Sequence, residues 1–177
     1  MADAEIVLRA PEPADIEVLY KWENDPDIWK VSNTITPFSK YILEKYIENA
    51  HLDIYQVKQL RLMIDVKETL KPVRTIGTID LFDFDPYHLR AGVGILIGNK
   101  SDRNKGFATK ALLKFSTYCF KILQLHQLFC NITVENSESL LLFRKCGFKI
   151  TGKKADWIKT PDGFVEELLL QLINPQA

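Results

Sequence analysis

The sequence predicts an α/β fold in which helices flank a mixed, mostly antiparallel central sheet. Three patterns support this fold class. Short apolar or alternating runs rich in Val, Ile and Phe indicate strands, whereas apolar residues three and four positions apart indicate helices. Clusters of Pro, Gly, Asn and Asp mark the turns between them. In chain order the predicted elements are βααβββαβαββ.

The N-terminal third is predicted to hold one strand and two helices. The strand covers Glu5–Arg9 and stops before two prolines. Asp15 can cap a first helix, which the run Asn-Asp-Pro-Asp ends. Residues 29–37 are expected to be irregular. Thr36 and Pro37 are interpreted as the N-cap and first position of a second helix.

The rest of the chain alternates strands with two more helices. Thr75–Phe84 and Arg90–Ile97 are predicted to form a hairpin around a polar turn. A long helix opens near Gly106, and a short one covers Ser137–Lys145. The remaining predicted strands are Leu60–Val66, Leu128–Val134, Phe148–Trp157 and Phe164–Ile173.

The composition is that of an ordinary globular chain, and we predict one domain over residues 1–177. Basic and acidic residues balance at 23 each, so nothing favours binding to nucleic acid or to a membrane surface. Residues 1–5 are not expected to belong to a signal peptide, and no apolar run reaches the roughly 18 residues of a membrane helix. Cys119, Cys130 and Cys146 lack metal-ligand spacing, and their odd number fits the reducing cytoplasm.

Arg90–Lys114 is the segment with the strongest functional signal. An apolar strand, a polar turn and an amphipathic helix bring free backbone N–H groups and a positive helix dipole together. Gly106 lets a ligand oxygen approach the backbone closely. Arg103, Lys105 and Lys110 oppose the dipole unless an anion such as a polyphosphate lies among them. A solvated basic turn before a helix explains the same spacing.

Two glycines interrupt the apolar strand before this turn. Gly92 and Gly94 each weaken a strand by about 0.5–1 kcal/mol relative to alanine, so they indicate a bulge or a close approach. Unpaired amides at a bulge could pair with an extended ligand. The alternative is packing against a bulky neighbour, for which Phe82 is the candidate.

Two sequence blocks resemble the GNAT N-acetyltransferases. Residues 103–108 read Arg-x-x-Gly-x-Ala after an apolar strand, which resembles the acetyl-CoA signature of that family. Residues 135–148 contain an Asn and then Phe-x-Lys-x-Gly-Phe, similar to the second family block. The opening residues 6–25 look like the branch that holds ribosomal-protein and spermidine acetyltransferases. The resemblance covers nearly the whole chain and implies the GNAT fold.

By this resemblance the chain is expected to use acetyl-CoA as its co-substrate. No metal is expected, because the sequence shows no metal-ligand spacing. The amides of residues 103–108 would cradle the pyrophosphate, and the strand at 95–97 would pair with the pantetheine arm. The backbone N–H of Leu96 would stabilise the oxyanion, which is worth about 2.7–4 kcal/mol. Asn136 would reach the arm from the other side, although it could also be a helix cap. The residues implied to contact CoA are Ile95, Leu96, Ile97, Arg103, Asn104, Lys105, Gly106, Phe107, Ala108, Thr109, Asn136 and Phe143.

Two positions depart from the family pattern. Phe143 stands where related enzymes commonly carry a Tyr general acid, and Gly92 stands where they often carry Glu. The missing acid is tolerable because a thiol with a pKa of about 8.5 gives a fair leaving group. The missing carboxylate matters more, since an ammonium cannot attack before it loses a proton.

The predicted hairpin offers a replacement base. If Phe84 pairs with Arg90, then Asp80 faces Gly94, shares a face with Gly92, and can accept the proton directly or through a water in the space that Gly92 leaves. A slip of one residue would place Asp83 there instead. Either aspartate is otherwise a solvated strand residue or a charge at the hairpin end.

The acceptor pocket is predicted to include Trp22, Asn24, Trp29 and Asp83. Acidic residues among 23–27 suit a cationic amine, although helix caps and solvation also explain them. The chain is therefore predicted to acetylate a primary amine of a protein N-terminus, a polyamine or another small molecule or peptide. The competing hypothesis is a catalytically weakened acyl-CoA-binding module that acts as a sensor or partner subunit. A homodimer is expected from the branch, in which dimers are common.

Overall fold

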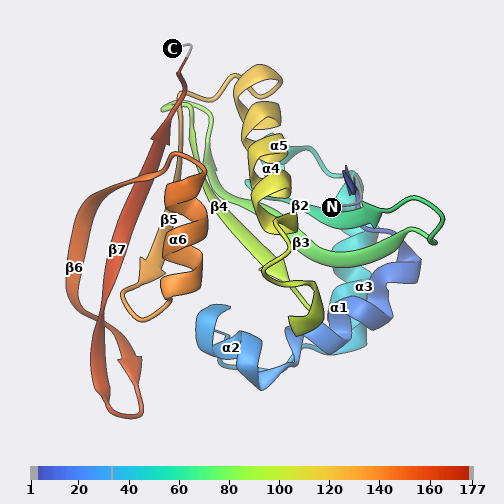
Figure 1. Cartoon of the computed structure of the whole chain (residues 1–177), viewed down its shortest axis with the longest axis horizontal. Coiled ribbons are helices and arrows are strands. Elements are labelled where there is room, and N and C mark those ends of the chain that lie inside the picture. The colour runs from blue at the N-terminus through green and yellow to red at the C-terminus, as the bar shows by residue number, and fades with distance from the viewer. Residues whose placement is uncertain (1–3, 33, 176–177) are drawn as a thin grey trace.

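Seven strands form one sheet in the computed structural model, which describes residues 4–32 and 34–175 (Figure 1). Their order across the sheet is β1-β2-β3-β4-β5-β7-β6. Neighbouring strands are antiparallel except β4 and β5, so the mixed, mostly antiparallel sheet is confirmed. The strands are β1 (Glu5–Arg9), β2 (Leu60–Lys67), β3 (Arg74–Asp85), β4 (Arg90–Ile97), β5 (Gln127–Thr133), β6 (Lys149–Thr160) and β7 (Gly163–Ile173).

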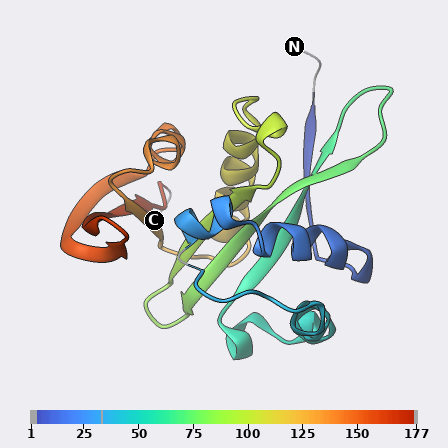
Figure 2. The ribbon, with the colours of Figure 1, turned by 90° about the horizontal axis from the view of Figure 1, so that it is seen from below.

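Helices cover both faces of the sheet. α5 (Phe107–Lys121) lies on one face, while α1 (Ile16–Glu23) and α3 (Lys40–Glu48) lie on the other (Figure 2). The remaining helices are α2 (Pro26–Ser32), α4 (Ile54–Val57) and α6 (Ser137–Lys145), with short 3-10 segments at Pro13–Asp15, Asn49–His51 and Lys100–Asp102. Among the residues described, no helix is both long enough and apolar enough to cross a membrane.

Each face of the sheet has its own core. The inner side of α5 is completely buried, and its spacing of three and four residues is the pattern that predicted the helix. Burying one such large apolar side chain stabilises the fold by about 1.5–3 kcal/mol. The α5 residues at 0% exposure are Ala111, Leu112, Phe115 and Cys119. The smaller core under α1 and α3 consists of Leu19, Trp22, Ile28, Leu43 and Met63.

Two lysines join α5 to the first strand. Lys110 Nζ donates to the carbonyl oxygen of Ala4 at 2.8 Å, and Lys114 Nζ donates to that of Ile6 at 2.8 Å. Lys110 was expected among the cations around the start of this helix. In the structure, Lys110 instead holds the backbone of the residue that precedes β1.

The eleven predicted elements are all present, with two additional helices. The run Asn-Asp-Pro-Asp ends α1, as predicted, but it also starts α2, because Asp25 Oδ1 accepts from the Asp27 amide at 2.9 Å and Pro26 occupies the first position. The expected start of the next helix at Thr36 was wrong. Ser39 is its N-cap and accepts from the Ile42 amide at 3.2 Å.

The β3–β4 hairpin has the expected central register and a different end. Asp80 pairs with Gly94 as predicted, but Asp85, not Phe84, lies opposite Arg90. A bulge between Phe82 and Asp85 takes up the extra residue. Asp83 lies in this bulge with a φ of 48°, and it is exposed.

The sheet opens between its two halves. The parallel pairing of β4 with β5 covers Arg90–Gly92, while β4 continues to Ile97. The two strands diverge from that point (Figure 1). Over the last residues of β4, the edge that faces β5 therefore has no neighbouring strand. This unpaired edge is where the cavity described below lies.

A buried ion network supports the N-terminal side of the sheet. Arg9 on β1 contacts Asp15 and Asp65, each at 2.7 Å, and also donates to Thr75 Oγ1 at 3.1 Å. Burial by itself would raise the pKa of Asp15. The Arg9 guanidinium and the Glu12 amide outweigh burial and hold this pKa below its usual value.

Replacing Arg9 with Gln should strongly destabilise the protein. The side chains of Asp15 and Asp65 are 8% and 9% exposed and would lose their shared cation. We expect the free energy of unfolding at pH 7 to fall by about 3 kcal/mol, measured by urea denaturation. Lys149→Gln, on the exposed start of β6, is the control and should stay within about 0.5 kcal/mol of wild type.

The Arg9 effect should depend on pH with a definite sign. A carboxylate with a lowered pKa stabilises the fold above its unfolded-state pKa of about 3.9, and this contribution disappears as the pH falls through the folded value. The difference between wild type and Arg9→Gln should therefore shrink in acid. A constant difference down to a pH of about 2 would contradict the role of Asp15.

Candidate active site

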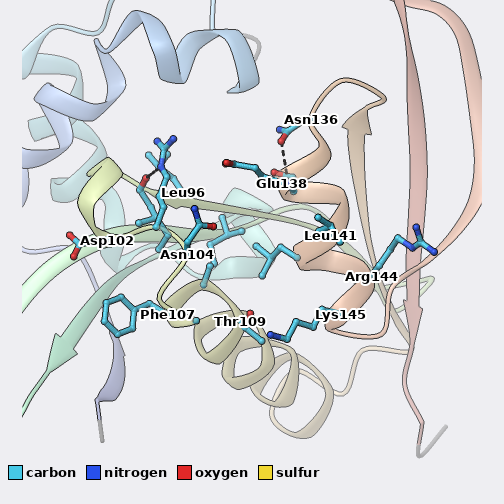
Figure 3. Close-up of a pocket in the computed structure, with 17 residues that line it drawn as sticks. Leu96, Asp102, Asn104, Phe107, Thr109, Asn136, Glu138, Leu141, Arg144 and Lys145 are labelled. Atoms are coloured by element: carbon cyan, nitrogen blue, oxygen red, sulfur yellow. Dashed lines mark hydrogen bonds between the residues drawn. The ribbon is translucent and has the colours of Figure 1, made fainter. Parts of the chain in front are cut away.

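A cavity of about 950 Å³ occupies the opening beside β4. The end of β4, the turn that follows it, the first turn of α5 and one face of α6 form its walls (Figure 3). The structure brings together most residues predicted to contact CoA: Ile95, Leu96, Ile97, Arg103, Asn104, Gly106, Phe107, Ala108, Thr109 and Asn136. Lys105 and Phe143 are absent from this wall.

The turn before α5 leaves backbone N–H groups free at the start of the helix. Gly106 is the N-cap of α5, with a φ of 80°, and no side chain caps the helix there. Within 4 Å of the position of a Gly106 Cβ there is open space, so a ligand can approach the backbone. Asn104 also has a positive φ, of 61°. Uncapped first-turn amides at a helix start, next to left-handed residues, provide donors for phosphate oxygens.

Charges in this turn are largely tied to the protein. Asp102 is 4% exposed and pairs with Arg74 at 2.7 Å, which neutralises a carboxylate that would otherwise repel phosphate. Lys105 Nζ lies 3.9 Å from the same carboxylate. Arg103 Nε donates to the Ile97 carbonyl at 3.2 Å. The backbone amides therefore carry much of the anion binding expected here.

The direction of the β4 amides corrects the expected oxyanion donor. Gly98 N donates to Ile76 on β3, and the Leu96 carbonyl lies against Gly77 of β3. Since backbone groups alternate sides along a strand, the Leu96 N–H also points at β3. The backbone N–H and C=O groups of Ile95 and Ile97 therefore face the opening. The hydrogen bond from Arg103 to the Ile97 carbonyl agrees with this direction. The Leu96 amide therefore does not face the opening, where the oxyanion donor was expected, whereas the amides of Ile95 and Ile97 do.

Two residues of the second sequence block have structural roles. Asn136 caps α6, with its Oδ1 accepting from the Ser139 amide at 3.2 Å, and it also lines the cavity, where its Nδ2 is the group that could reach a ligand (Figure 3). Phe143 is 3% exposed and packs edge-on against Phe148 with ring centroids 5.0 Å apart. Its ring belongs to the core and does not line the cavity where it was expected to contact CoA.

Asp80 belongs to β3, next to β4. It lies on the face of the sheet that α1 covers, within a charge cluster. Arg61 Nε contacts Asp80 Oδ1 at 2.5 Å, and Arg61 also pairs with Glu23 at the end of α1. Two carboxylates thus share one guanidinium, which leaves a net charge of −1. Burial raises the pKa of Asp80, although Arg61 opposes this shift. Tyr46 lies beneath the Arg61 guanidinium at 5.6 Å.

The glycines of β4 have a packing explanation. The Phe82 ring occupies the space that a Gly92 side chain would need, so there is no room beside Gly92 for the water considered above. A Cβ added at Gly94 would lie 3.7 Å from the same ring, which is an ordinary contact distance. Asp80 is paired with Gly94, and Leu96, two residues further along β4, lines the cavity. The aspartate therefore lies close to the expected thioester position.

The four residues expected in the acceptor pocket lie in different environments, and none of them lines the cavity. Trp22 is 2% exposed in the smaller core, where it lies against Gly98. Asn24 uses both ends of its amide to hold Phe38 and the end of α1. Trp29 is half-buried and donates to the Glu23 carbonyl. Asp83 is exposed in the hairpin bulge.

Sequence reasoning missed one wall of the cavity. Glu138, Ser139, Leu141, Leu142, Arg144 and Lys145 all line it from α6. The signal was available, because positions 138, 141, 142 and 145 share a helix face at spacings of three and four. It also missed Arg61, whose pairing with a carboxylate from α1 depends on tertiary structure.

Fold and cavity together define a transferase-like site for a phosphate-bearing cofactor between β4 and α6. A sequence comparison identifies the family, since residues 5–149 match the acetyltransferase (GNAT) domain. The chain belongs to the GNAT acetyltransferase family, which confirms the recognition made from the two sequence blocks.

Relatives and solved structures agree with this assignment. An uncharacterized N-acetyltransferase p20 of Bacillus licheniformis is 29% identical, covering 96% of this chain and 93% of the relative. A spermidine N(1)-acetyltransferase of Vibrio cholerae is 26% identical, covering 82% and 80%. A crystal structure of spermidine N-acetyltransferase from Vibrio cholerae, in complex with CoA and spermine, matches with a TM-score of 0.80 at 23% identity, covering 95% of each chain. That structure confirms the fold.

Gly106→Ala should weaken acetyl-CoA binding. A side chain at a φ of 80° is strained by about 1–2 kcal/mol, and the added methyl enters the open space above the turn. We expect the dissociation constant to rise about tenfold or more, measured by calorimetric titration. Gly163→Ala is the matched control, since Gly163 also has a positive φ, of 128°, and open space around it, but lies at the β6–β7 turn. Equal losses in both variants would contradict the role of Gly106.

Proposed function

We propose that this chain transfers the acetyl group of acetyl-CoA to a primary amine of a small polycationic substrate such as spermidine. The observation that carries the proposal is the cavity, in which an uncapped helix start and an open strand edge meet within a GNAT domain. The spermidine acetyltransferases among the relatives support a polyamine as the acceptor.

The residues present fit CoA without added assumptions. The amides from Arg103 to Thr109 would hold the pyrophosphate at the start of α5. The pantetheine arm would extend along the open edge of β4 and accept and donate hydrogen bonds at Ile95 and Ile97. Asn136 would approach the arm from α6. This arrangement delivers the thioester to the end of β4.

The acceptor would arrive on the opposite side of β4, where Asp80 lies. The substrate ammonium first gives a proton to the Asp80 carboxylate, and its nitrogen lone pair then attacks the thioester carbon. Of the Ile95 and Ile97 amides, the one that the pantetheine arm leaves free would stabilise the oxyanion. The intermediate carries a negative oxygen and a positive nitrogen, and it collapses as the C–S bond breaks. The nitrogen gives its second proton to solvent water, and the thiolate of CoA takes one proton from solvent, since its conjugate thiol has a pKa of about 8.5. The products are the acetylated amine and CoA.

The charge cluster favours a cationic acceptor. Arg61 neutralises one of its two carboxylate partners, so the Glu23–Arg61–Asp80 cluster retains one negative charge beside β4. Their side chains are between 16% and 26% exposed, which limits solvent screening. Exposed Asp83 and Glu138 would add negative charge along the approach. A second amine of the same substrate could bind there.

Cellular location and assembly form part of the same proposal. Cys119, Cys130 and Cys146 are buried unpaired thiols, and burial raises the pKa of Cys119 and Cys130 to about 12. Such thiols suit the cytoplasm. A dodecameric structure of the spermidine N-acetyltransferase from Vibrio cholerae supports self-association of this chain as well. Light scattering after size-exclusion chromatography measures the assembly directly.

The activity is tested by following thiol release from acetyl-CoA. Spermidine and spermine should stimulate release, whereas a neutral primary amine of similar length should react much more slowly. A peptide with a free N-terminus tests the other acceptor class. Release that stays at the hydrolysis background with every amine, despite tight acetyl-CoA binding, would favour an acyl-CoA-binding module instead.

Asp80→Asn should lower kcat. The variant keeps the shape and a hydrogen bond to Arg61 but cannot accept a proton, so we expect a loss of about 10²–10⁴-fold. Glu23→Gln is the matched control, because it removes the other carboxylate of the same cluster. This control should raise KM for the amine more than it lowers kcat. An unchanged kcat in Asp80→Asn would remove Asp80 as the base.

The pH profile separates proton transfer from simple charge attraction. Because the base must be deprotonated, kcat/KM should fall as the pH drops through the pKa of Asp80. Since burial raises that pKa, the loss should begin above the usual range of an aspartate. Asp80→Asn should lose this acidic limb, whereas Glu23→Gln should retain it.

A further inference from the structure

Two phenylalanines, Phe82 on β3 and Phe129 on β5, meet across β4. Their rings lie edge to face, with centroids 6.1 Å apart and an angle of 83° between the ring planes. Gly92 of β4 pairs with both residues, so this strand passes between them without a side chain. The Phe82 ring fills the space that a Cβ at Gly92 would need. The two rings therefore form one aromatic surface over a glycine of β4.

This aromatic pair lies outside both hydrophobic cores. Each side chain is half-buried, and in the part of the chain that the structure describes neither ring belongs to the large core under α5 or to the smaller one under α1 and α3. Alternation along β3 places Phe82 on the same face as Asp80. The neighbours of Phe129 in β5, Leu128 and Cys130, are buried in the large core, so the Phe129 ring also points to the α1 side. The pair is a partly open apolar surface on the face that would receive the acceptor.

The surroundings of Asp80 direct an acceptor toward the two rings. Phe82 follows Asp80 by two residues, or about 7 Å along β3. Asp80 pairs with Gly94, so no side chain of β4 separates the carboxylate from the Phe82 ring. On the other side, Arg61 of β2 pairs with Asp80 and occupies the space next to its carboxylate. A chain attached to an ammonium at Asp80 would therefore extend over the rings rather than toward β2.

We propose that Phe82 and Phe129 bind the alkyl chain of the acceptor amine, so that catalytic efficiency rises with the length of that chain. The inference rests on the proposed function, because it requires an ammonium at Asp80 and acetyl-CoA in the cavity. Methylene groups leave water when they lie on aromatic rings, and a second ammonium further along the chain is attracted to the ring faces. Asp80 then recognises the charge of the acceptor, and the two rings recognise its chain.

Packing over the strand glycines is a simpler explanation of the pair. An edge-to-face contact stabilises a fold wherever it occurs, and the Phe82 ring fills a surface that Gly92 leaves bare. Under this explanation, losing a ring lowers the melting temperature and changes kcat/KM by the same factor for every amine. Chain binding instead predicts that the dependence of kcat/KM on chain length disappears. Neither explanation predicts a change in KM for acetyl-CoA.

The experiment measures kcat/KM for ethylamine, n-propylamine and n-butylamine by thiol release from acetyl-CoA, with spermidine as the reference acceptor. The three alkylamines carry one ammonium each, so the charge stays constant while the chain grows. In wild type, kcat/KM should rise about twofold to fourfold with each methylene, as expected for partial to full burial. Phe129→Thr should reduce this rise to less than about 1.5-fold. Phe129→Leu, which stays apolar, should keep most of it.

Phe164→Thr is the matched control, because it removes the same ring from another strand. Phe164 is exposed on β7, and alternation with Leu168 and Leu170 places it on the α5 side of the sheet. This variant should keep the wild-type dependence on chain length. Thermal melting shows which variants are folded. The wild-type series tests the inference by itself if Phe129→Thr does not fold.

Other results would overturn the inference in distinguishable ways. If wild type acetylates spermidine but shows no gain with chain length, or does not accept the alkylamines, the inference fails while the proposed function stands. If Phe129→Thr keeps the wild-type dependence, or if Phe164→Thr loses it equally, the rings do not bind the chain. If neither spermidine nor any alkylamine releases thiol from acetyl-CoA, the proposed function and the inference fail together.

Discussion

The site depends on the early end of pairing between β4 and β5. Three residue pairs join these strands, and β4 then runs on to Ile97 without β5 beside it. Unpaired backbone amides cost free energy when they are buried in a protein interior. Beside a cavity, the same amides can form hydrogen bonds with an extended ligand. The same divergence makes room for α6 to form the far wall, and it directs the turn before α5 toward the opening.

Opposite charges are kept on opposite sides of β4. The α5 side offers backbone donors and neutralises its buried carboxylate, Asp102, with Arg74. The α1 side holds two carboxylates on a single guanidinium, that of Arg61. A polyanionic cofactor and a cationic acceptor can therefore approach the end of one strand from different directions without competing. Removing Arg61 would leave two partly buried carboxylates near each other, so its role is to make the cluster tolerable.

The fold was predictable from sequence because its signals are local. Helix periodicity, turn residues and the α6 boundaries depend on near neighbours, and Ser137–Lys145 matched in full. The pairing of Asp80 with Gly94 also followed from the sequence pattern of the hairpin. The bulge at Asp83 was not predicted, because one extra residue near the turn leaves the pairing in the middle of the strands unchanged. What could not be predicted were contacts between distant segments: Arg61 with Glu23, Trp22 against Gly98, and the direction of the Leu96 amide. These depend on how the layers pack.

The lysine contacts between α5 and β1 bear on how the protein can be handled. The carbonyl groups of Ala4 and Ile6 hold the helix whose first turn faces the cavity, so these two residues take part in placing that turn. Bulky fusions or trimming at this end would disturb a remote ligand site while leaving most of the core intact.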